Sequence, residues 1–143
     1  GVKHRLQYVG DYKGVKYYND SKATNPVATI TALSGFEQNV VLLCGGKDRG
    51  IDFHELVPYL DRVKAMVVVG ESAEILQELA DSNNIKCIKA VKIDDATEEA
   101  SKIAETGDIV LLSPACASWD QYKSFEVRGD EFISTFKRIQ SKG

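Results

Sequence analysis

An uninterrupted apolar run at residues 40–44 constrains the fold of this chain more than any other feature. It reads Val-Val-Leu-Leu-Cys and leads directly into Gly45 and Gly46. A strand with one face in water alternates apolar and polar residues, whereas a strand covered on both faces is apolar throughout. Two further runs, at residues 65–69 and 109–112, have the same character. The chain therefore requires helices on both faces of a sheet.

Segments with helical periodicity separate these runs, and such alternation favours a mainly parallel sheet. We predict strands at residues 4–9, 15–18, 40–44, 65–69, 85–91 and 109–112, and helices at residues 26–33, 53–59, 72–80, 95–105 and 128–139. The first two strands form a hairpin around residues 10–14. The predicted fold class is α/β, a Rossmann-like three-layer domain. Its mainly parallel sheet has about six strands, helices on both faces and an antiparallel edge hairpin.

Composition excludes several classes of function. A length of 143 residues suits a single domain, and a net charge of -3 provides no basic surface for nucleic acid. The apolar runs are far shorter than the roughly 20 residues of a membrane helix, and the polar start predicts no signal peptide. Three isolated cysteines predict a reducing cytosol and no disulfide framework. Two histidines without paired cysteines argue against a zinc site.

A dense polar loop follows the second predicted strand. Residues 19–26 read Asn-Asp-Ser-Lys-Ala-Thr-Asn-Pro. Asn25 before Pro26 predicts a helix N-cap followed by proline at the first helical position. A strand end that faces a helix N-terminus is where open α/β sheets bind anionic ligands. The loop therefore predicts a site for a phosphate or a carboxylate.

Two more loops of this kind, at residues 45–50 and 113–118, follow other parallel strands, so all three are expected at one edge of the sheet. Structural explanations stay open for each. A tight turn alone can explain the glycine pair. The basic side chains can be solvated charges, and the serines and Asp20 can be turn formers or helix caps. Cys116 is predicted to be an apolar filler and His54 to be structural or exposed. The loop at 45–50 lacks the full P-loop pattern, and neither histidine is tied to a serine.

Several segments together resemble the C-terminal domain of the Mur ligases of peptidoglycan synthesis, in the group that adds D-glutamate. The resemblance covers nearly the whole chain, and its most specific part is the run at residues 19–25. Sibling Mur ligases that add other residues carry different strings at that place. The motifs are His4-Arg5, residues 19–25, Gly45-Gly46 with Asp52-Phe53, residues 111–118 with Asp120-Gln121, and Phe125-Glu126 with residues 128–130.

The resemblance implies a three-domain ligase. Residues 1–143 are then its C-terminal, D-glutamate-binding domain, and residues 1–3 are a remnant of the interdomain linker. The central domain is expected to hold the P-loop and the ligands of Mg²⁺, so no metal ligand is assigned to this chain. The expected substrates are ATP, D-glutamate and UDP-N-acetylmuramoyl-L-alanine.

The implied reaction uses ATP to convert the carboxylate of UDP-N-acetylmuramoyl-L-alanine into an acyl phosphate. The amine of D-glutamate attacks this group to give an amide, ADP and phosphate. The domain alone is expected to be inactive. The resemblance also implies a monomer in the bacterial cytoplasm, with no nucleic acid or membrane as a partner.

The resemblance assigns roles to single residues. Arg5 and Asp20 are expected against the nucleotide, and Lys22 near its phosphates, as the catalytic residue of this domain. Thr24 is expected to bind the α-carboxylate of D-glutamate. The γ-carboxylate and its pocket are assigned to Ser118, Trp119 and the backbone near Phe125.

One position departs from the family pattern. Several members have lysine in the loop after the glycine pair, where this chain has Arg49. Arginine keeps the charge and adds a fork that suits a carboxylate. The alignment leaves Lys47 as the alternative for this role.

Two other classes of function remain open on the residues alone. One is a regulatory α/β module that binds a small anionic metabolite without chemistry. The other is a complete flavodoxin-like or nucleotide-binding protein, although the chain lacks a Gly-x-Gly-x-x-Gly fingerprint.

Overall fold

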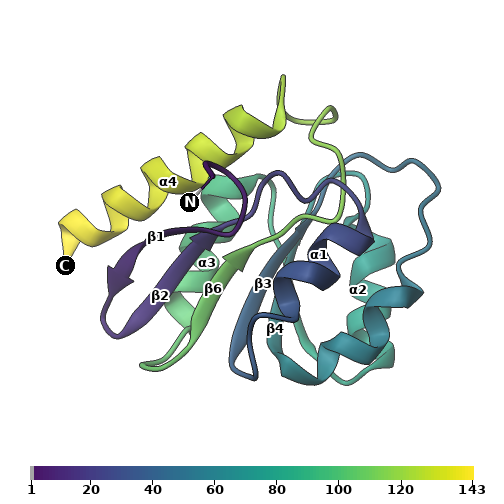
Figure 1. Cartoon of the computed structure of the whole chain (residues 1–143), viewed down its shortest axis with the longest axis horizontal. Helices are drawn as coiled ribbons and strands as arrows, with labels where there is room; N and C mark the ends of the chain where they lie inside the picture. The colour runs from purple at the N-terminus through teal and green to yellow at the C-terminus, as the bar shows by residue number, and fades with distance from the viewer. Residues whose placement is uncertain (1) are drawn as a thin grey trace.

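Six strands form one sheet in the order β1-β2-β6-β3-β4-β5 (Figure 1). The computed structural model describes residues 2–143. Only β1 is antiparallel to its neighbour, and every other pair is parallel. The predicted mainly parallel sheet with an antiparallel edge hairpin is confirmed. The strands are β1 Gln7–Tyr12, β2 Val15–Asn19, β3 Val40–Gly45, β4 Val63–Val69, β5 Lys86–Lys89 and β6 Ile109–Leu112.

Helices cover both faces of the sheet, as the apolar runs predicted (Figure 1). One layer consists of α1 (Pro26–Leu33), the 3-10 helix η1 (His54–Arg62) and α2 (Ala73–Ser82). The opposite layer consists of α3 (Ile93–Ile103) and the long α4 (Phe125–Lys142). Each layer packs its own hydrophobic core against the sheet.

The central strand β3 connects the two cores. Val40, Leu42 and Cys44 belong to the core under α1, η1 and α2. Val41 and Leu43 point the other way and belong to the core under α3 and α4. All five side chains are 0% exposed, which explains why this run contains no polar residue.

The edge hairpin is tighter than predicted. Residues 10–14 were expected to form its turn, but β1 continues to Tyr12 and only Lys13 and Gly14 connect the strands. Both residues have positive φ, 51° and 77°, as a two-residue hairpin turn requires. The pairing register of the two strands shifts between Tyr8 and Gly10, as it does at a β-bulge.

Several predicted helices differ from the structure in type or in bounds. The helix expected at 53–59 is a 3-10 helix that contains Pro58, which has no backbone donor for a regular α-helix. Helix α3 runs from Ile93 to Ile103, so it begins and ends two residues before the predicted range of 95–105. Helix α4 begins at Phe125 instead of residue 128, because the Ser124 side chain accepts a hydrogen bond from the Val127 amide and caps the helix earlier.

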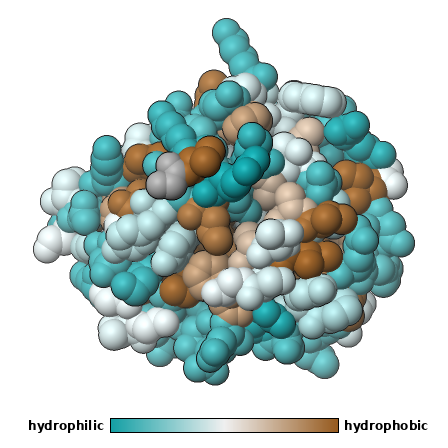
Figure 2. All heavy atoms as spheres, viewed as in Figure 1, coloured by the Kyte–Doolittle hydropathy of each residue, from teal (hydrophilic) through white to brown (hydrophobic). Residues whose placement is uncertain are grey.

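The surface seen from the side of α1 is largely hydrophilic, with hydrophobic side chains gathered near its middle (Figure 2). Leu6, Tyr8 and Val27 are among the large apolar side chains exposed to solvent. None of the helices in residues 2–143 combines the length and the apolar character that a bilayer crossing requires.

Candidate functional site

The three polar loops meet at the carboxyl edge of the sheet, as predicted. The Lys47 amide donates to the Ala117 carbonyl at 2.9 Å, which joins the loops after β3 and β6. The Asp20 amide donates to the Leu112 carbonyl at 2.7 Å, which joins the loop after β2 to the end of β6. Ala115 in the loop after β6 has a left-handed backbone, with φ of 60°, a strained conformation that clusters at functional sites.

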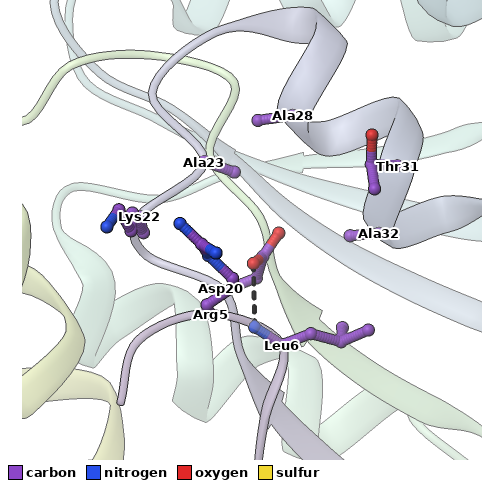
Figure 3. A pocket seen from close by; sticks show the side chains of 8 residues that line it. All are labelled: Arg5, Leu6, Asp20, Lys22, Ala23, Ala28, Thr31 and Ala32. Carbon is purple, nitrogen blue, oxygen red and sulfur yellow. Dashed lines mark hydrogen bonds between the residues drawn. The ribbon is translucent and has the colours of Figure 1, made fainter. Parts of the chain in front are cut away.

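One cavity at this edge lies between residues 4–6 and helix α1 (Figure 3). It has a volume of about 630 Å³ and offers charged groups on one wall and small side chains of α1 on the other. All three residues assigned to the nucleotide contribute to it. The lining consists of Arg5, Leu6, Asp20, Lys22, Ala23, Ala28, Thr31 and Ala32. We call it the strap cavity.

Asp20 fastens one wall of the strap cavity. Its carboxylate accepts hydrogen bonds from the Leu6 amide at 2.9 Å and from the Ser113 hydroxyl at 2.7 Å. Burial raises the pKa of the Asp20 carboxyl, and the two hydrogen bonds and the charge of Arg5 oppose this rise. Since both carboxylate oxygens already have partners, Asp20 holds the loop after β6 and residues 4–6 in place.

Residues 4–6 form a strap over the loop that follows β2. His4 and Leu6 have left-handed backbones with φ of 66° and 41°, a conformation that costs roughly 1 kcal/mol or more outside glycine. Hydrogen bonds compensate for this strain: the Lys22 amide donates to the His4 carbonyl at 2.9 Å, and Asn19 Nδ2 lies 2.8 Å from His4 Nδ1. The strap thereby holds the Arg5 side chain beside Asp20 (Figure 3).

A second cavity lies between the ends of the loops and the start of α4, and we call it the loop cavity. Its volume is about 340 Å³. Every residue assigned to D-glutamate contributes to it, although these residues come from three separate loops and a helix. The lining consists of Thr24, Arg49, Ala117, Ser118, Trp119, Lys123, Ser124, Phe125 and Glu126.

The structure separates the two basic residues of the loop after β3. The Arg49 guanidinium lies 5.0 Å from the centre of the Trp119 ring and lines the loop cavity. Lys47 Nζ instead lies 3.1 Å from a carboxylate oxygen of Glu71, and Lys47 is not among the lining residues. Of the two alternatives that the sequence left open, only Arg49 lies in the cavity.

The loop cavity favours an anionic ligand. Thr24 lies two residues before α1, and Phe125 is the first residue of α4. A helix N-terminus carries a partial positive charge of about half an elementary charge. Arg49 and Lys123 add two positive charges, against one negative charge from Glu126. The arrangement suits a small ligand with more than one carboxylate.

The sequence-based interpretation did not assign a role to Arg128, although the residue lies in one of the quoted motifs. Its side chain is 1% exposed and lies beneath the loops, where its nitrogens donate to Ser21 and to the Cys116 carbonyl. Burial lowers the pKa of Arg128 to about 10, so the guanidinium stays charged at neutral pH. The sequence does contain one signal of close packing at this point, the glycine at position 129 within the helix. A Cβ on Gly129 would lie 2.2 Å from His4 Nδ1.

The remaining candidates have structural roles or none. Cys116 is buried and packs as a filler, as predicted, and burial raises the pKa of its thiol to about 11. His54 is exposed and pairs with Asp52 at 2.8 Å, which agrees with the expectation of a structural or exposed histidine. Within residues 2–143, no group of three or more His, Cys, Asp or Glu side chains has an arrangement that could hold a metal ion.

Residues 4–116 match the family model described as "Mur ligase, glutamate ligase domain". The chain is 59% identical over 139 residues to the UDP-N-acetylmuramoylalanine–D-glutamate ligase of Shouchella clausii, covering 97% of this chain and 31% of the relative. It is 57% identical over 141 residues to the enzyme of the same name from Streptococcus suis, covering 98% and 31%. The chain therefore spans about a third of the length of these relatives.

Solved structures support the fold. The UDP-N-acetylmuramate-alanine ligase of Thermotoga maritima superposes with a TM-score of 0.68 and 16% identity, covering 100% of this chain and 31% of that one. A MurF ligase from the same organism, solved in complex with ADP, gives a TM-score of 0.58 and 20% identity, covering 99% and 32%. At these identities the likeness concerns the fold alone.

Proposed function

This chain belongs to the Mur ligase family, as a glutamate ligase domain, and we propose that it is the part of an ATP-dependent ligase that binds D-glutamate. In the proposed reaction, the whole enzyme joins D-glutamate to UDP-N-acetylmuramoyl-L-alanine in peptidoglycan synthesis. The amine acceptor is then held by this domain. The UDP sugar and most of the nucleotide are held by the two other domains of a chain about three times as long.

The observation that carries the proposal is the sorting of the assigned residues between two cavities. Thr24, Arg49, Ser118, Trp119 and Phe125 line the loop cavity. The residues assigned to the nucleotide line the strap cavity. The loop after β2 contributes to both cavities, through Lys22 on one side and Thr24 on the other. Such adjacency supports a reaction in which the amine attacks the carbonyl carbon of the acyl phosphate close to the nucleotide, and phosphate leaves.

The chemistry of the loop cavity supports D-glutamate as its ligand. The amino acid carries two carboxylates, and hydrogen bonds from charged donors to such groups contribute about 1.5–3 kcal/mol each. We assign Thr24 to the α-carboxylate. We assign Ser118, the start of α4 and Arg49, which lies against Trp119, to the γ-carboxylate. Held in this way, the amine is positioned for attack, which makes a bimolecular step effectively local.

The strap cavity supports contact with the nucleotide. Arg5 and the exposed Lys22 are the cations of its lining, and the apolar side chains of α1 face them (Figure 3). We propose that Lys22 neutralises charge on the phosphates during transfer to the sugar peptide carboxylate. Mg²⁺ is assigned to the central domain, and its chemistry there would be further neutralisation of the phosphates. We place the whole enzyme in the cytoplasm, as a monomer.

Matched variants of the full-length enzyme test the proposal. Arg49→Ala should raise the KM for D-glutamate about tenfold or more, because it removes a charged donor from the loop cavity. Lys47→Ala removes a cation that pairs with Glu71 and does not line the loop cavity, so the KM for D-glutamate should change less than about threefold. The rate of amide formation is measured from the phosphate that the reaction releases. The concentrations of D-glutamate and of ATP are varied in turn to give the two KM values.

Two results would contradict the proposal. A wild-type enzyme that forms no amide with D-glutamate rejects the assigned substrate. An enzyme in which Arg49→Ala changes only the KM for ATP rejects the placement of D-glutamate in the loop cavity.

A further inference from the structure

Arg128 is the largest of the fully buried side chains, and it is charged. It lies in the first turns of α4, below the loop cavity that α4 helps to line. None of the ion pairs in residues 2–143 includes it. No carboxylate of these residues is in direct contact with Arg128, although the charge of Asp120 favours the guanidinium. A buried charge without a contacting counter-ion costs several kcal/mol unless it is well hydrogen-bonded. An apolar side chain of similar size would avoid this cost, so the guanidinium needs an explanation.

The hydrogen bonds of Arg128 all go to neutral groups on the loops. Nε donates to the Ser21 hydroxyl at 3.0 Å, and Nη2 donates to the Ser21 carbonyl at 2.7 Å. Nη1 donates to the Cys116 carbonyl at 3.0 Å. The Ser21 hydroxyl donates in turn to the Phe125 carbonyl at 2.7 Å. One planar group therefore connects the loop after β2, the loop after β6 and the start of α4.

These contacts lie next to the residues that line the loop cavity. Cys116 immediately precedes Ala117 and Ser118, and Phe125 is itself part of the lining. The loop after β3 approaches at the same point, where a Cβ on Gly46 would lie 2.5 Å from the Ala117 carbonyl and 3.4 Å from Arg128 Nη1. The strap cavity is fastened differently, through the hydrogen bonds of Asp20 to Leu6 and Ser113.

We propose that Arg128 is a positioning residue for the loop cavity: its guanidinium sets the spacing between the Ser118 wall, the Phe125 wall and the loop that carries Thr24. The inference rests on the function proposed above, because it deepens the account of the same site. It acts through backbone and hydroxyl groups and involves no contact between Arg128 and the substrate. The role depends on the shape of the fork, since a lysine has a single nitrogen and cannot reach three acceptors in fixed directions.

The test uses the full-length enzyme with two independent variants. Arg128→Lys keeps the charge and removes the fork. Ser21→Ala removes only the hydroxyl that links Arg128 to Phe125, so it retains the fold even if the first variant does not. We expect both to raise the KM for D-glutamate about tenfold or more, because displacement of a binding group by about 1 Å has effects of this size or larger. The KM for ATP should rise by a smaller factor than the KM for D-glutamate. Ser21 lies between two residues of the strap cavity, but Asp20 holds that cavity through its own hydrogen bonds to Leu6 and Ser113.

A control and a double variant separate positioning from general stability. Phe136 lies in the same helix and packs on Tyr17, far from the loops. Phe136→Leu should lower the melting temperature and leave both KM values unchanged. Ser21→Ala combined with Ser118→Ala should raise the KM for D-glutamate by less than the product of the single effects, because Ser118 and the start of α4, to which Ser21 is hydrogen-bonded, are assigned to the same carboxylate.

Each outcome has a separate meaning. If the wild-type enzyme forms the amide and Ser21→Ala leaves the KM for D-glutamate unchanged, the inference about Arg128 is wrong. It is also wrong if Phe136→Leu raises that KM as much as Ser21→Ala does. If the wild-type enzyme does not use D-glutamate at all, the failure belongs to the proposed function.

Discussion

Buried polar side chains organise the loops of this domain, residue by residue. Asp20 and Arg128 are 5% and 1% exposed, and both are hydrogen-bonded to neutral groups. Burial of each side chain costs solvation free energy, and its hydrogen bonds hold the loops in a defined geometry. This exchange is typical of a site whose ligand must be held in one orientation.

The pH dependence of Asp20→Asn tests the cost of the buried carboxylate. Burial raises the folded-state pKa of Asp20 above its unfolded value, so the folded state holds the proton more tightly. Its contribution to the free energy of unfolding is therefore largest at low pH and is lost as pH rises through the folded pKa. Asparagine has no such loss, and it can accept from the Leu6 amide and donate to the Ser113 hydroxyl.

We therefore expect Asp20→Asn to gain stability relative to the wild-type chain between pH 3 and pH 7, by about 1.4 kcal/mol per unit of pKa difference. Urea unfolding of this chain at several pH values measures the difference. A stability difference that stays constant over this range would show that Asp20 has the same pKa in both states.

At the scale of elements, the short helix α1 illustrates how local signals determine an element. It has only eight residues, and Asn25 and Pro26 mark its start. The Asn25 side chain accepts a hydrogen bond from the Ala28 amide at 3.0 Å, and Pro26 occupies a position where no amide donor is needed. Since an isolated helix of this length is unstable, its cap and its packing must supply the stability.

Asn25→Ala should lower the free energy of unfolding by about 1 kcal/mol, because it leaves the Ala28 amide without its side-chain acceptor. Asn25→Asp is the matched control and should retain most of the stability, since a carboxylate accepts the same bond and interacts well with the helix N-terminus. Chemical denaturation of this chain compares the three proteins. Equal losses in both variants would contradict the capping role.

At the scale of the whole molecule, the inner strands β6, β3 and β4 support both layers, because each contributes to both hydrophobic cores. Strand β3 is central in the sheet and contributes to both hydrophobic cores. The carboxyl ends of β2, β6 and β3 are neighbours, so the same sheet also brings the three loops together. The core and the candidate site thus depend on the same strand order.

Val41→Asp should leave this chain unfolded at neutral pH. The side chain is 0% exposed beneath α3 and α4, and burial of an unpaired carboxylate costs an amount comparable with the 5–15 kcal/mol that typically stabilises a domain of this size. Circular dichroism and urea titration measure the loss. Val91→Asp is the control, because Val91 is 71% exposed and its substitution should change stability by less than about 0.5 kcal/mol.

The sequence by itself determined the elements whose signals are local. The apolar runs of β3, β4 and β6 predicted strands covered on both faces, and the Asn25-Pro26 pair predicted the start of α1. Both signals involve residues within a few positions of each other, so no knowledge of distant contacts was needed. The motifs likewise indicated which side chains belong to the candidate site.

Only the tertiary structure decided how those side chains are divided and supported. It placed Arg49 in the loop cavity and Lys47 against Glu71, although the two residues are neighbours in one loop. It also placed Arg128 beneath that cavity, where its partner Ser21 lies 107 residues away in the sequence. Periodicity and capping carry no information about such distant partners, because these hydrogen bonds exist only once the strand order has brought the loops to one edge of the sheet.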